Sequence, residues 1–468
     1  MSGGGYIMKK ITLRTLAAAM SLMMLLTGCS EGNETDSSEA RITTASQSYE
    51  ESSEAPETTQ GVKMPTDGDV IPWEGEGDPL AGEKSSTTAA STTKTQTTTT
   101  TTKAAATTTK AAAQQNNGGG GNNGGNNGGG GAKPAVTPKP APAPTFASGT
   151  PVQRHGALRV SGNHIVDSHG QVFMLQGMST HGIMWSDESN TIPFSGILST
   201  NSLRVLRDDW RCNAVRIAMY TEEWGGYTTG YASQAKAKVE TGVANATSLG
   251  MYVIIDWHIL HDGNPQTHKS QAIAFFKEMA QKYKNYSNVI YEICNEPNGG
   301  VTWAGQIKGY CQEVVNAIRC IDKNKLIICG TGTWSQDIDK VLGNRLSDAN
   351  CLYTLHFYAN THTDWLRQRL QNCYNSGLPV LVTEFGTCDA SGNGGFNESQ
   401  TRAWYNLLKN LKVGWFNWSA ANKNETASAF KAGTNLANIS AGESQLTQSG
   451  RLIRTLFREN AAANAAYV

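Results

Sequence analysis

The feature that most constrains the fold is a regular series of eight short apolar runs between about residues 150 and 460. Segments with the hydrophobic periodicity of helices separate these runs. Two of these segments, "QAIAFFKEMAQKYK" and "TDWLRQRLQNCYNSG", carry apolar residues at helical spacing. The eight runs span Val172 to Met178, Ala214 to Met219, Tyr252 to Trp257, Val289 to Ile293, Leu326 to Gly330, Leu352 to Phe357, Val380 to Glu384 and Val413 to Trp418. Because strands that alternate with helices pair in parallel through helical crossovers, the pattern predicts an α/β fold, a (β/α)8 TIM barrel. The alternative, an open doubly wound sheet, needs a glycine-rich phosphate loop after an early strand, and we find none in the sequence.

The carboxyl ends of the strands form the active face of such a barrel. Here they read "GMSTHG", "RIAMY", "IIDWH", "YEICNEP", "GTGTW", "LHFYA", "TEFG" and "FNWS". A barrel that used these positions only for stability would have little reason to place polar side chains there. The candidate site residues at these ends are His181, Arg216, His258, Asn295, Glu296, His356, Tyr358 and Glu384. Asp256 is ambiguous, because support of the neighbouring His258 would explain it equally well.

The fourth run, "VIYEICNEP", begins as a buried strand and ends in Asn295 and Glu296. Carboxylates are rarely buried without a partner, so Glu296 either reaches solvent or is held in a cleft for a purpose. Glu384 ends the seventh run, and the two side chains can converge across the barrel mouth.

The segment from Val152 to Glu459 resembles the catalytic domain of glycoside hydrolase family 5, especially bacterial endoglucanases with an opening motif similar to "VQRHGALRVSGNHIVDSHGQ". The shared motifs are an Asn-Glu-Pro strand end, "HFYA" and a later Thr-Glu-aromatic-Gly strand end, all in family order. The resemblance implies that Glu296 is the acid/base and Glu384 the nucleophile of a retaining endo-β-1,4-glucanase. Phe385 departs from the family's frequent tryptophan, which puts the fine positioning of the nucleophile in doubt.

The resemblance also implies roles for the neighbouring residues. Arg216 can hold Glu384 ionised, His356 and Tyr358 can orient the two glutamates, and Asn295 is placed to bind the sugar 2-hydroxyl. His258 is expected to support the same site. Substrate would be bound by Trp418 beside the scissile sugar, Trp185 on the non-reducing side, Trp334 on the reducing side, and His181, Tyr220, Lys423 and Glu425 around the next glucosyl unit. Trp210, Trp404 and Trp415 are expected in the core.

The first third of the chain has a different composition. Residues 1–29 end in an apolar run and Leu26-Thr27-Gly28-Cys29, which resembles a bacterial lipobox and predicts a lipid anchor on Cys29; an ordinary signal peptide is the alternative. Residues 30–148 are acidic, then rich in Thr, Gly, Asn and Pro, and we expect a disordered linker. The catalytic domain is expected over 149–460, with a tail over 461–468. The predicted location is the bacterial cell surface.

Charge and cysteine usage limit the partners. The net charge is zero and the folded part has no basic block, which argues against nucleic acid. Of nine cysteines, Cys29 belongs to the signal, and the remaining eight show no short-spaced framework, so we expect mostly free, buried thiols. Without a motif such as HExxH we expect neither a metal nor another cofactor. We expect a monomer that acts on β-1,4-glucan; mannan and xyloglucan, or a non-catalytic glucan-binding role, are the alternatives.

Overall fold

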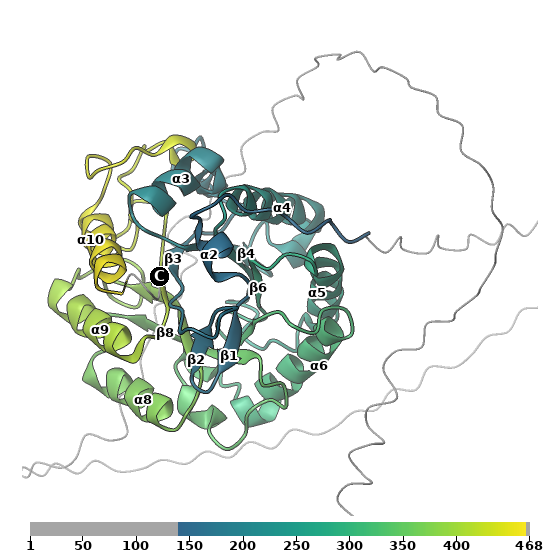
Figure 1. Cartoon of the computed structure of the whole chain (residues 1–468). Coiled ribbons are helices and arrows are strands. Elements are labelled where there is room, and N and C mark those ends of the chain that lie inside the picture. Colours follow the sequence, from purple (N-terminus) through teal and green to yellow (C-terminus); the bar gives the residue numbers. More distant parts are fainter. Residues whose placement is uncertain (1–138, 465–468) are drawn as a thin grey trace, which may run out of the picture. The chain divides into compact units, whose positions relative to one another are not determined.

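The predicted barrel is confirmed by a computed structural model, which describes residues 139–464 (Figure 1). Eight parallel strands close in the order β10-β3-β4-β5-β6-β7-β8-β9. The strands are β3 (Gln176–Ser179), β4 (Ala214–Tyr220), β5 (Tyr252–His258), β6 (Val289–Glu292), β7 (Ile327–Cys329), β8 (Cys351–Tyr358), β9 (Val380–Gly386) and β10 (Trp415–Asn417). Each overlaps one of the eight apolar runs. The expected signal, Cys29 and residues 30–138 of the expected linker lie outside the described residues.

Helices surround the strands as an outer ring (Figure 1). They are α3 (Thr200–Asp208), α4 (Ala232–Ser248), α5 (Lys269–Tyr283), α6 (Lys308–Arg319), α8 (Asp364–Asn375), α9 (Glu398–Leu411) and α10 (Gln448–Ala463). The short α7 (Gly332–Ser335) follows β7 directly. In α5, Ala272, Phe275, Phe276 and Met279 recur at helical spacing and are buried. Such an apolar stripe is what fastens a helix to the sheet beneath it.

Helix α10 continues to Ala463, past the domain end expected at residue 460. Alanine, which dominates this stretch, has the highest helix propensity. Asn460 is fully buried and its side-chain amide donates to the Gln176 Oε1 at 2.7 Å, which ties the end of the helix to β3. The buried asparagine therefore anchors the last turn of α10.

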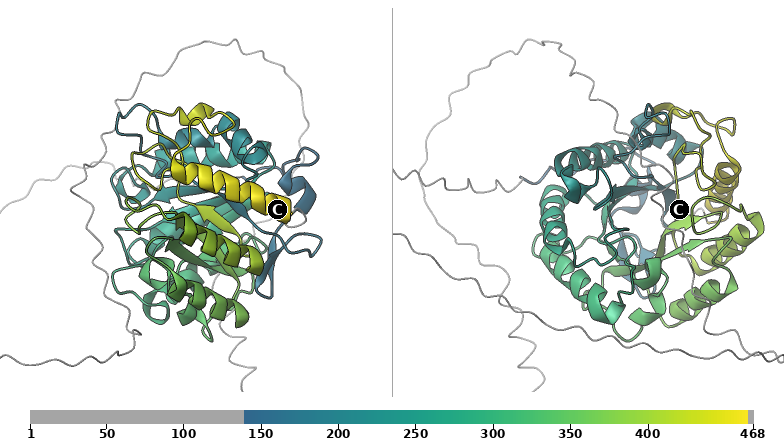
Figure 2. Two further views of the ribbon diagram at one scale, coloured as in Figure 1. Left: turned by 90° about the vertical axis from the view of Figure 1, so that its left-hand side faces the viewer. Right: turned by 180° about the vertical axis from the view of Figure 1, so that it is seen from behind.

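The amino-terminal end of the barrel is closed by a plug. It consists of α2 (Pro151–His155) and the antiparallel hairpin of β1 (Arg159–Ser161) and β2 (His164–Val166), which lie across the ring in Figure 1. Val152, Leu158 and Ile165 of the plug join one apolar cluster with inward-facing strand residues such as Ile254 and Leu352. The end of α10 lies at the same end of the barrel (Figure 2). The plug does not cover the opposite end of the barrel, which the carboxyl ends of the strands form and where an active site is expected.

Side chains along each strand point alternately into and out of the barrel. The inward-facing positions nearer the carboxyl ends of the strands therefore bring polar groups into the interior, next to this apolar layer. On β4 the inward series runs from Ala214 to Arg216 and on to Tyr220, while Val215 and Ile217 pack outward against the helices. Since β4 is buried on both faces, its sequence is nearly continuously apolar, and Arg216 is the exception.

A register shift between β8 and β9 brings one glutamate into place. Thr354 pairs with Leu381, and two residues later His356 pairs with Glu384, so β9 holds one extra residue. Such a bulge re-aims the side chains that follow it. Without the shift, His356 would face Thr383 in the register, and Glu384 would lie one position further along.

Two further properties of residues 139–464 bear on the sequence-based expectations. Seven of the eight cysteines in this range, all except Cys320, are free and buried, which confirms mostly free, buried thiols. The sulfur atoms of Cys294 and Cys311 are 3.9 Å apart, well beyond the length of a disulfide bond. Within this range no helix has both the length and the hydrophobicity needed to cross a membrane.

Candidate active site

Two glutamates meet at the open end of the barrel. Glu296 follows β6 and Glu384 belongs to β9, and they are only 8% and 4% exposed. One carboxylate oxygen of each and one ring nitrogen of His356 all lie within 4.8 Å of one another. Retaining glycosidases use a carboxyl pair about 5 to 5.5 Å apart, whereas inverting enzymes use a wider pair.

A fully buried arginine organises the floor of the site. The Arg216 guanidinium donates to Glu384 Oε2 at 3.2 Å, to Glu292 Oε2 at 2.8 Å and to Asn295 Oδ1 at 2.5 Å, and it lies 3.0 Å from Asp256 Oδ2. The expected contact with Glu384 is therefore present. Arg216 also compensates two further buried carboxylates, which fixes its own orientation.

Glu292 is a member of this network that sequence reasoning missed. It is fully buried in β6, and it accepts from Arg216 and from the Thr383 hydroxyl, the latter at 2.6 Å. The signal was present in "VIYEICNEP", where a charged residue interrupts a strand that is otherwise apolar. A charge in such a place requires a buried partner.

The surroundings of the two candidate catalytic glutamates differ. Glu384 accepts from Arg216 and from the Tyr358 hydroxyl, which is 2.9 Å from its Oε1. In the described part of the chain, the carboxyl of Glu296 has one side-chain hydrogen bond, to His356 Nδ1 at 2.8 Å. Burial raises the pKa of Glu296 to about 8 and that of Glu384 to about 7. The carboxyl with the higher pKa, Glu296, is suited to be the acid, and Glu384 is suited to be the ionised partner.

His356 favours the protonated form of Glu296. Burial lowers the pKa of His356 to about 4, so its ring is neutral. Its Nε2 lies 2.8 Å from the Thr383 hydroxyl, whose own proton goes to Glu292. Nε2 therefore carries the ring proton and donates to Thr383. The bare Nδ1 then faces Glu296 and can accept from its carboxyl group, which stabilises the neutral acid.

A second set of hydrogen bonds fixes Asn295. His258 Nδ1 lies 2.6 Å from Asp256 Oδ2, and its Nε2 is 3.3 Å from the Asn295 amide nitrogen. Asn295 also donates to the Ile259 carbonyl at 3.2 Å. Burial lowers the pKa of His258, so the neutral ring donates to Asp256 and accepts from Asn295. Asp256 thus contacts both His258 and Arg216, which resolves its ambiguous assignment in favour of a place in the site.

Aromatic and charged side chains gather on one side of the glutamates. The ring of Trp418 lies 5.3 Å from that of His258 and 5.0 Å from that of His181. Further along, Tyr220 lies 4.4 Å from Trp185. Trp418 is 5% exposed, so its ring is largely covered. The peptide bond between Trp418 and Ser419 is cis.

Lys423 and Glu425 complete this side. The Lys423 ammonium is 2.7 Å from Glu425 Oε2, and His181 Nε2 is 3.7 Å from the other carboxylate oxygen. Burial raises the pKa of Glu425 even beside the lysine. The structure therefore brings together the residues that the sequence placed around the next glucosyl unit.

Trp334 lies on the other side, next to the loop of Glu296. Its backbone N–H donates to the Pro297 carbonyl at 3.1 Å. Thr333, Trp334 and Ser335 all have φ between 50° and 59°, the left-handed region that side chains rarely adopt. Ser335 anchors this run by donating from its hydroxyl to the Asn295 carbonyl at 2.7 Å. Strained backbone of this kind concentrates at functional sites. This fits the expectation that the turn holds the Trp334 side chain toward the substrate.

The remaining aromatic expectations concern the core. Trp210, Trp404 and Trp415 are buried, as predicted. Phe385, where the family often has tryptophan, is buried and stacks on Phe357 with ring centroids 5.1 Å apart. Phe385 also accepts from the Trp418 backbone N–H at 2.9 Å through its carbonyl. The side chain at position 385 thus packs in the hydrophobic core, against Phe357 and Trp415.

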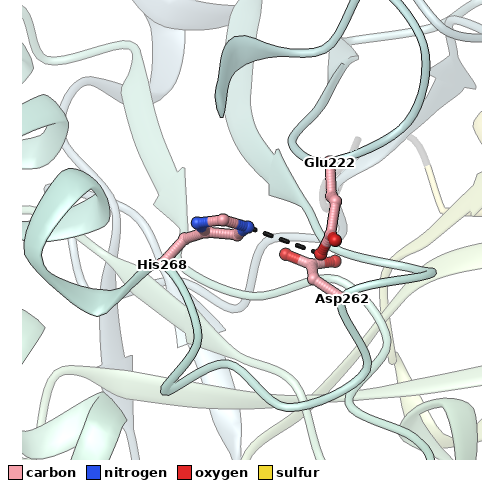
Figure 3. A group of neighbouring side chains, drawn as sticks. All are labelled: Glu222, Asp262 and His268. Carbon is pink, nitrogen blue, oxygen red and sulfur yellow. Dashed lines mark ion pairs between the residues drawn. The ribbon is translucent and has the colours of Figure 1, made fainter. Parts of the chain in front are cut away.

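A second group with ligand-capable atoms lies on the loops after β4 and β5. Figure 3 shows His268 pointing toward the carboxylates of Glu222 and Asp262. The three could each offer one ligand atom to a metal ion, and these atoms lie within 4.8 Å of one another. His268 Nε2 is 3.4 Å from Glu222 Oε2, and the Thr221 hydroxyl donates to Asp262 at 2.9 Å. These contacts join the two loops.

Comparison with known proteins identifies the family. The family described as Cellulase (glycosyl hydrolase family 5) matches residues 166–424, more than half of the chain. The chain belongs to glycosyl hydrolase family 5. The matched region contains both glutamates and Arg216. The candidate sugar-binding side consists of His181, Trp185, Tyr220, Trp418, Lys423 and Glu425, and all of these except Glu425 lie in the matched region.

This family 5 protein is similar to several proteins named endoglucanases. It is 46% identical over 299 residues to an endoglucanase of Clostridium saccharobutylicum, covering 64% of each chain. It is 46% identical over 318 residues to endoglucanase N of Pectobacterium atrosepticum, covering 67% of this chain and 68% of that one. The chain thus spans about two thirds of the length of these relatives. Among solved structures, the catalytic domain of Thermobifida fusca endoglucanase Cel5A in complex with cellotetraose matches with a TM-score of 0.60 and 35% identity, covering 66% of this chain and all of that domain.

Proposed function

We propose that this family 5 glycosyl hydrolase is a retaining endo-β-1,4-glucanase that cuts internal bonds of cellulose or related β-glucans. The observation that carries the proposal is the approach of Glu296 and Glu384, with oxygens within 4.8 Å, at the open end of the barrel. Relatives named endoglucanases and a related domain in complex with cellotetraose support the choice of glucan.

The first chemical step joins the sugar to the enzyme. The Glu384 carboxylate attacks the anomeric carbon while Glu296 donates its proton to the departing glycosidic oxygen, so that the glycosidic bond breaks and an ester bond forms. Arg216 and the Tyr358 hydroxyl hold the nucleophile ionised and in place. Asn295, held by Arg216 and His258, is positioned for the sugar 2-hydroxyl, a contact that strengthens in the transition state.

The second step releases the sugar. Once Glu384 is esterified its negative charge is gone, which lowers the pKa of the neighbouring Glu296 and favours its ionised form. Glu296 then removes a proton from water, the oxygen of that water attacks the anomeric carbon, and the ester bond to Glu384 breaks. Two inversions at one carbon give a product with the configuration of the substrate.

The substrate preference is proposed from the sugar-binding side. Lys423 and Glu425, in "ANKNETAS", carry paired charges toward the hydroxyls expected beyond the scissile sugar. A product profile on carboxymethylcellulose, mixed-linkage glucan, xyloglucan and mannan tests the assignment. We expect the unbranched glucans to be cleaved fastest. Cleavage of mannan at an equal or higher rate would contradict it and would favour the alternative of a mannanase.

A non-catalytic glucan-binding protein is the alternative from another class. Loss of catalysis would show as a missing carboxylate, whereas both glutamates are present and converge. The same product profile separates the two functions, because a binding protein would release no reducing sugar from any polymer. We also propose that the domain acts as a monomer, because a single barrel supplies both glutamates and the side chains that hold them.

We further propose that the enzyme is exported and held at the bacterial cell surface by a lipid on Cys29. Support comes from Leu26-Thr27-Gly28-Cys29 at the end of an apolar run and from the low-complexity composition of residues 30–148. A linker of that composition would hold the catalytic barrel at a distance from the membrane, where it can reach an insoluble polymer.

A further inference from the structure

An exposed tryptophan lies next to the sugar-binding side without a role in the mechanism. Among residues 139–464, the large hydrophobic side chains that are clearly exposed are Trp224, at 39%, and Trp365, at 41%. Trp224 follows the end of β4, the strand that delivers Arg216 and Tyr220. The indole N–H of Trp185 donates to the Trp224 carbonyl at 2.8 Å.

This hydrogen bond places the backbone of Trp224 next to a row of rings that runs from Trp418 to Trp185. Ring centroids are 5.3 Å apart between Trp418 and His258, 4.1 Å between His258 and Tyr220, and 4.4 Å between Tyr220 and Trp185. The inner rings are buried, Trp185 is half-buried, and Trp224 is exposed. The row therefore leads from Trp418 toward the surface at Trp185, and the exposed side chain of Trp224 follows from the residue whose carbonyl binds the Trp185 indole.

The loop that carries Trp224 is fastened to the neighbouring loop by side-chain contacts. Its first residues are joined to the loop after β5 by the hydrogen bond from Thr221 to Asp262 and by the ion pair of Glu222 with His268 (Figure 3). A Cβ at Gly226 would meet the Thr221 carbonyl oxygen at 2.4 Å, so the turn requires glycine there. A side chain presented on such a loop loses little conformational entropy when it binds a ligand.

We propose that Trp224 is an outer sugar-binding platform, one step beyond Trp185 on the non-reducing side, and that it selects for long β-1,4-glucan chains. The proposal rests on the proposed function and extends its binding cleft. A flat indole ring covers the apolar face of a glucosyl unit, and the exposed ring of Trp224 is free to do so. Short oligosaccharides that end at Trp185 would not reach it.

Trp365 supplies a matched control. It is as exposed as Trp224 but begins α8, where its ring lies 5.9 Å from that of His362 and 5.4 Å from the Arg369 guanidinium. It is not part of the row. Replacing either tryptophan with alanine removes a similar exposed area, so a general effect of losing a surface tryptophan should be equal in the two variants.

The experiment compares W224A and W365A in the full chain on cello-oligosaccharides of increasing length. For W224A we expect kcat/KM on cellohexaose to fall by about tenfold, the value of one aromatic contact, with cellotriose changed by less than about twofold. W365A should change neither by more than about twofold. An equal loss at all lengths, or no loss on cellohexaose, would overturn the proposal. Melting temperatures by circular dichroism establish that both variants fold.

A binding measurement keeps this inference separate from the proposed function. If the wild-type protein cleaves none of the oligosaccharides, the proposed activity is wrong. Retardation in gels that contain hydroxyethylcellulose then still tests Trp224. Weaker retardation of W224A than of W365A supports the platform, and equal retardation of the two overturns it.

Discussion

Replacement of Glu296 with glutamine tests the assignment of the acid. Glutamine has nearly the same shape, and the 2.8 Å hydrogen bond with His356 Nδ1 can be kept through its amide N–H. Folding should therefore survive, while the transferable proton is lost. In the wild-type protein, burial raises the pKa of Glu296 to about 8, and the acid must be protonated to act. Because Glu384 must be ionised and its pKa is about 7, activity on glucan should be highest between the two pKa values, and it should fall as the pH rises through about 8.

The magnitude follows from the role of the proton. General acid catalysis contributes roughly 10²- to 10⁴-fold, so kcat/KM on a soluble glucan should fall by about that factor in E296Q. A dinitrophenyl cellobioside departs without protonation, and its kcat/KM should fall by less than about tenfold. Its kcat and KM should fall together, because the glycosyl-enzyme accumulates when the base that activates water is missing. With this substrate the alkaline limb of the variant's pH profile should disappear.

Glu223 provides the control for the pH profile. It is buried outside the catalytic pair, and burial raises its pKa to about 7, so its titration is another possible source of a limb near neutral pH. E223Q should leave the alkaline limb unchanged. Two results would refute the assignment of Glu296: an alkaline limb that persists in E296Q, or equal losses on the glucan and the activated cellobioside.

Other predictions address the network, the platform and the anchor. The charge of Glu292 raises the pKa of Glu296, so E292Q should move the alkaline limb to lower pH by about half to one unit, and an unmoved limb would contradict the network. W418A should lower turnover on long glucans by a factor of tens or more and still fold; unfolding at ambient temperature in a circular dichroism melt would show that Trp418 is structural. C29A should move the protein from the membrane fraction to the soluble fraction, and retention would remove the lipid anchor. Deleting residues 1–138 should leave specific activity on soluble glucan nearly unchanged, which a reducing-sugar assay measures.

The barrel could be predicted from the sequence because its two strongest sequence signals, the apolar runs and their polar ends, are local. Each strand is a short apolar run, and each run ends where polar residues begin, so the eight ends could be recognised one at a time. Parallel pairing then places all the ends on one face. This is why Glu296, Glu384, His356 and Tyr358 could be expected to meet before any geometry was known.

The parts that could not be predicted depend on register and on depth within the barrel. The extra residue of β9 that puts Glu384 opposite His356 leaves no mark in the sequence. Glu292 belongs to the same strand as the recognised Glu296, yet its inward direction and its contact with Thr383 emerge only when strands are aligned. Trp224 could not be separated from a core tryptophan, because exposure depends on the path of the loop after β4.

The most direct test of a double displacement is to trap the intermediate. A 2-deoxy-2-fluoro cellobioside with an activated leaving group should inactivate the enzyme, and peptide mass spectrometry should find the sugar on Glu384. Proton NMR of the natural reaction should show the β-anomer as the first product. A label on any other residue, or an α-configured first product, would contradict the roles proposed for Glu296 and Glu384.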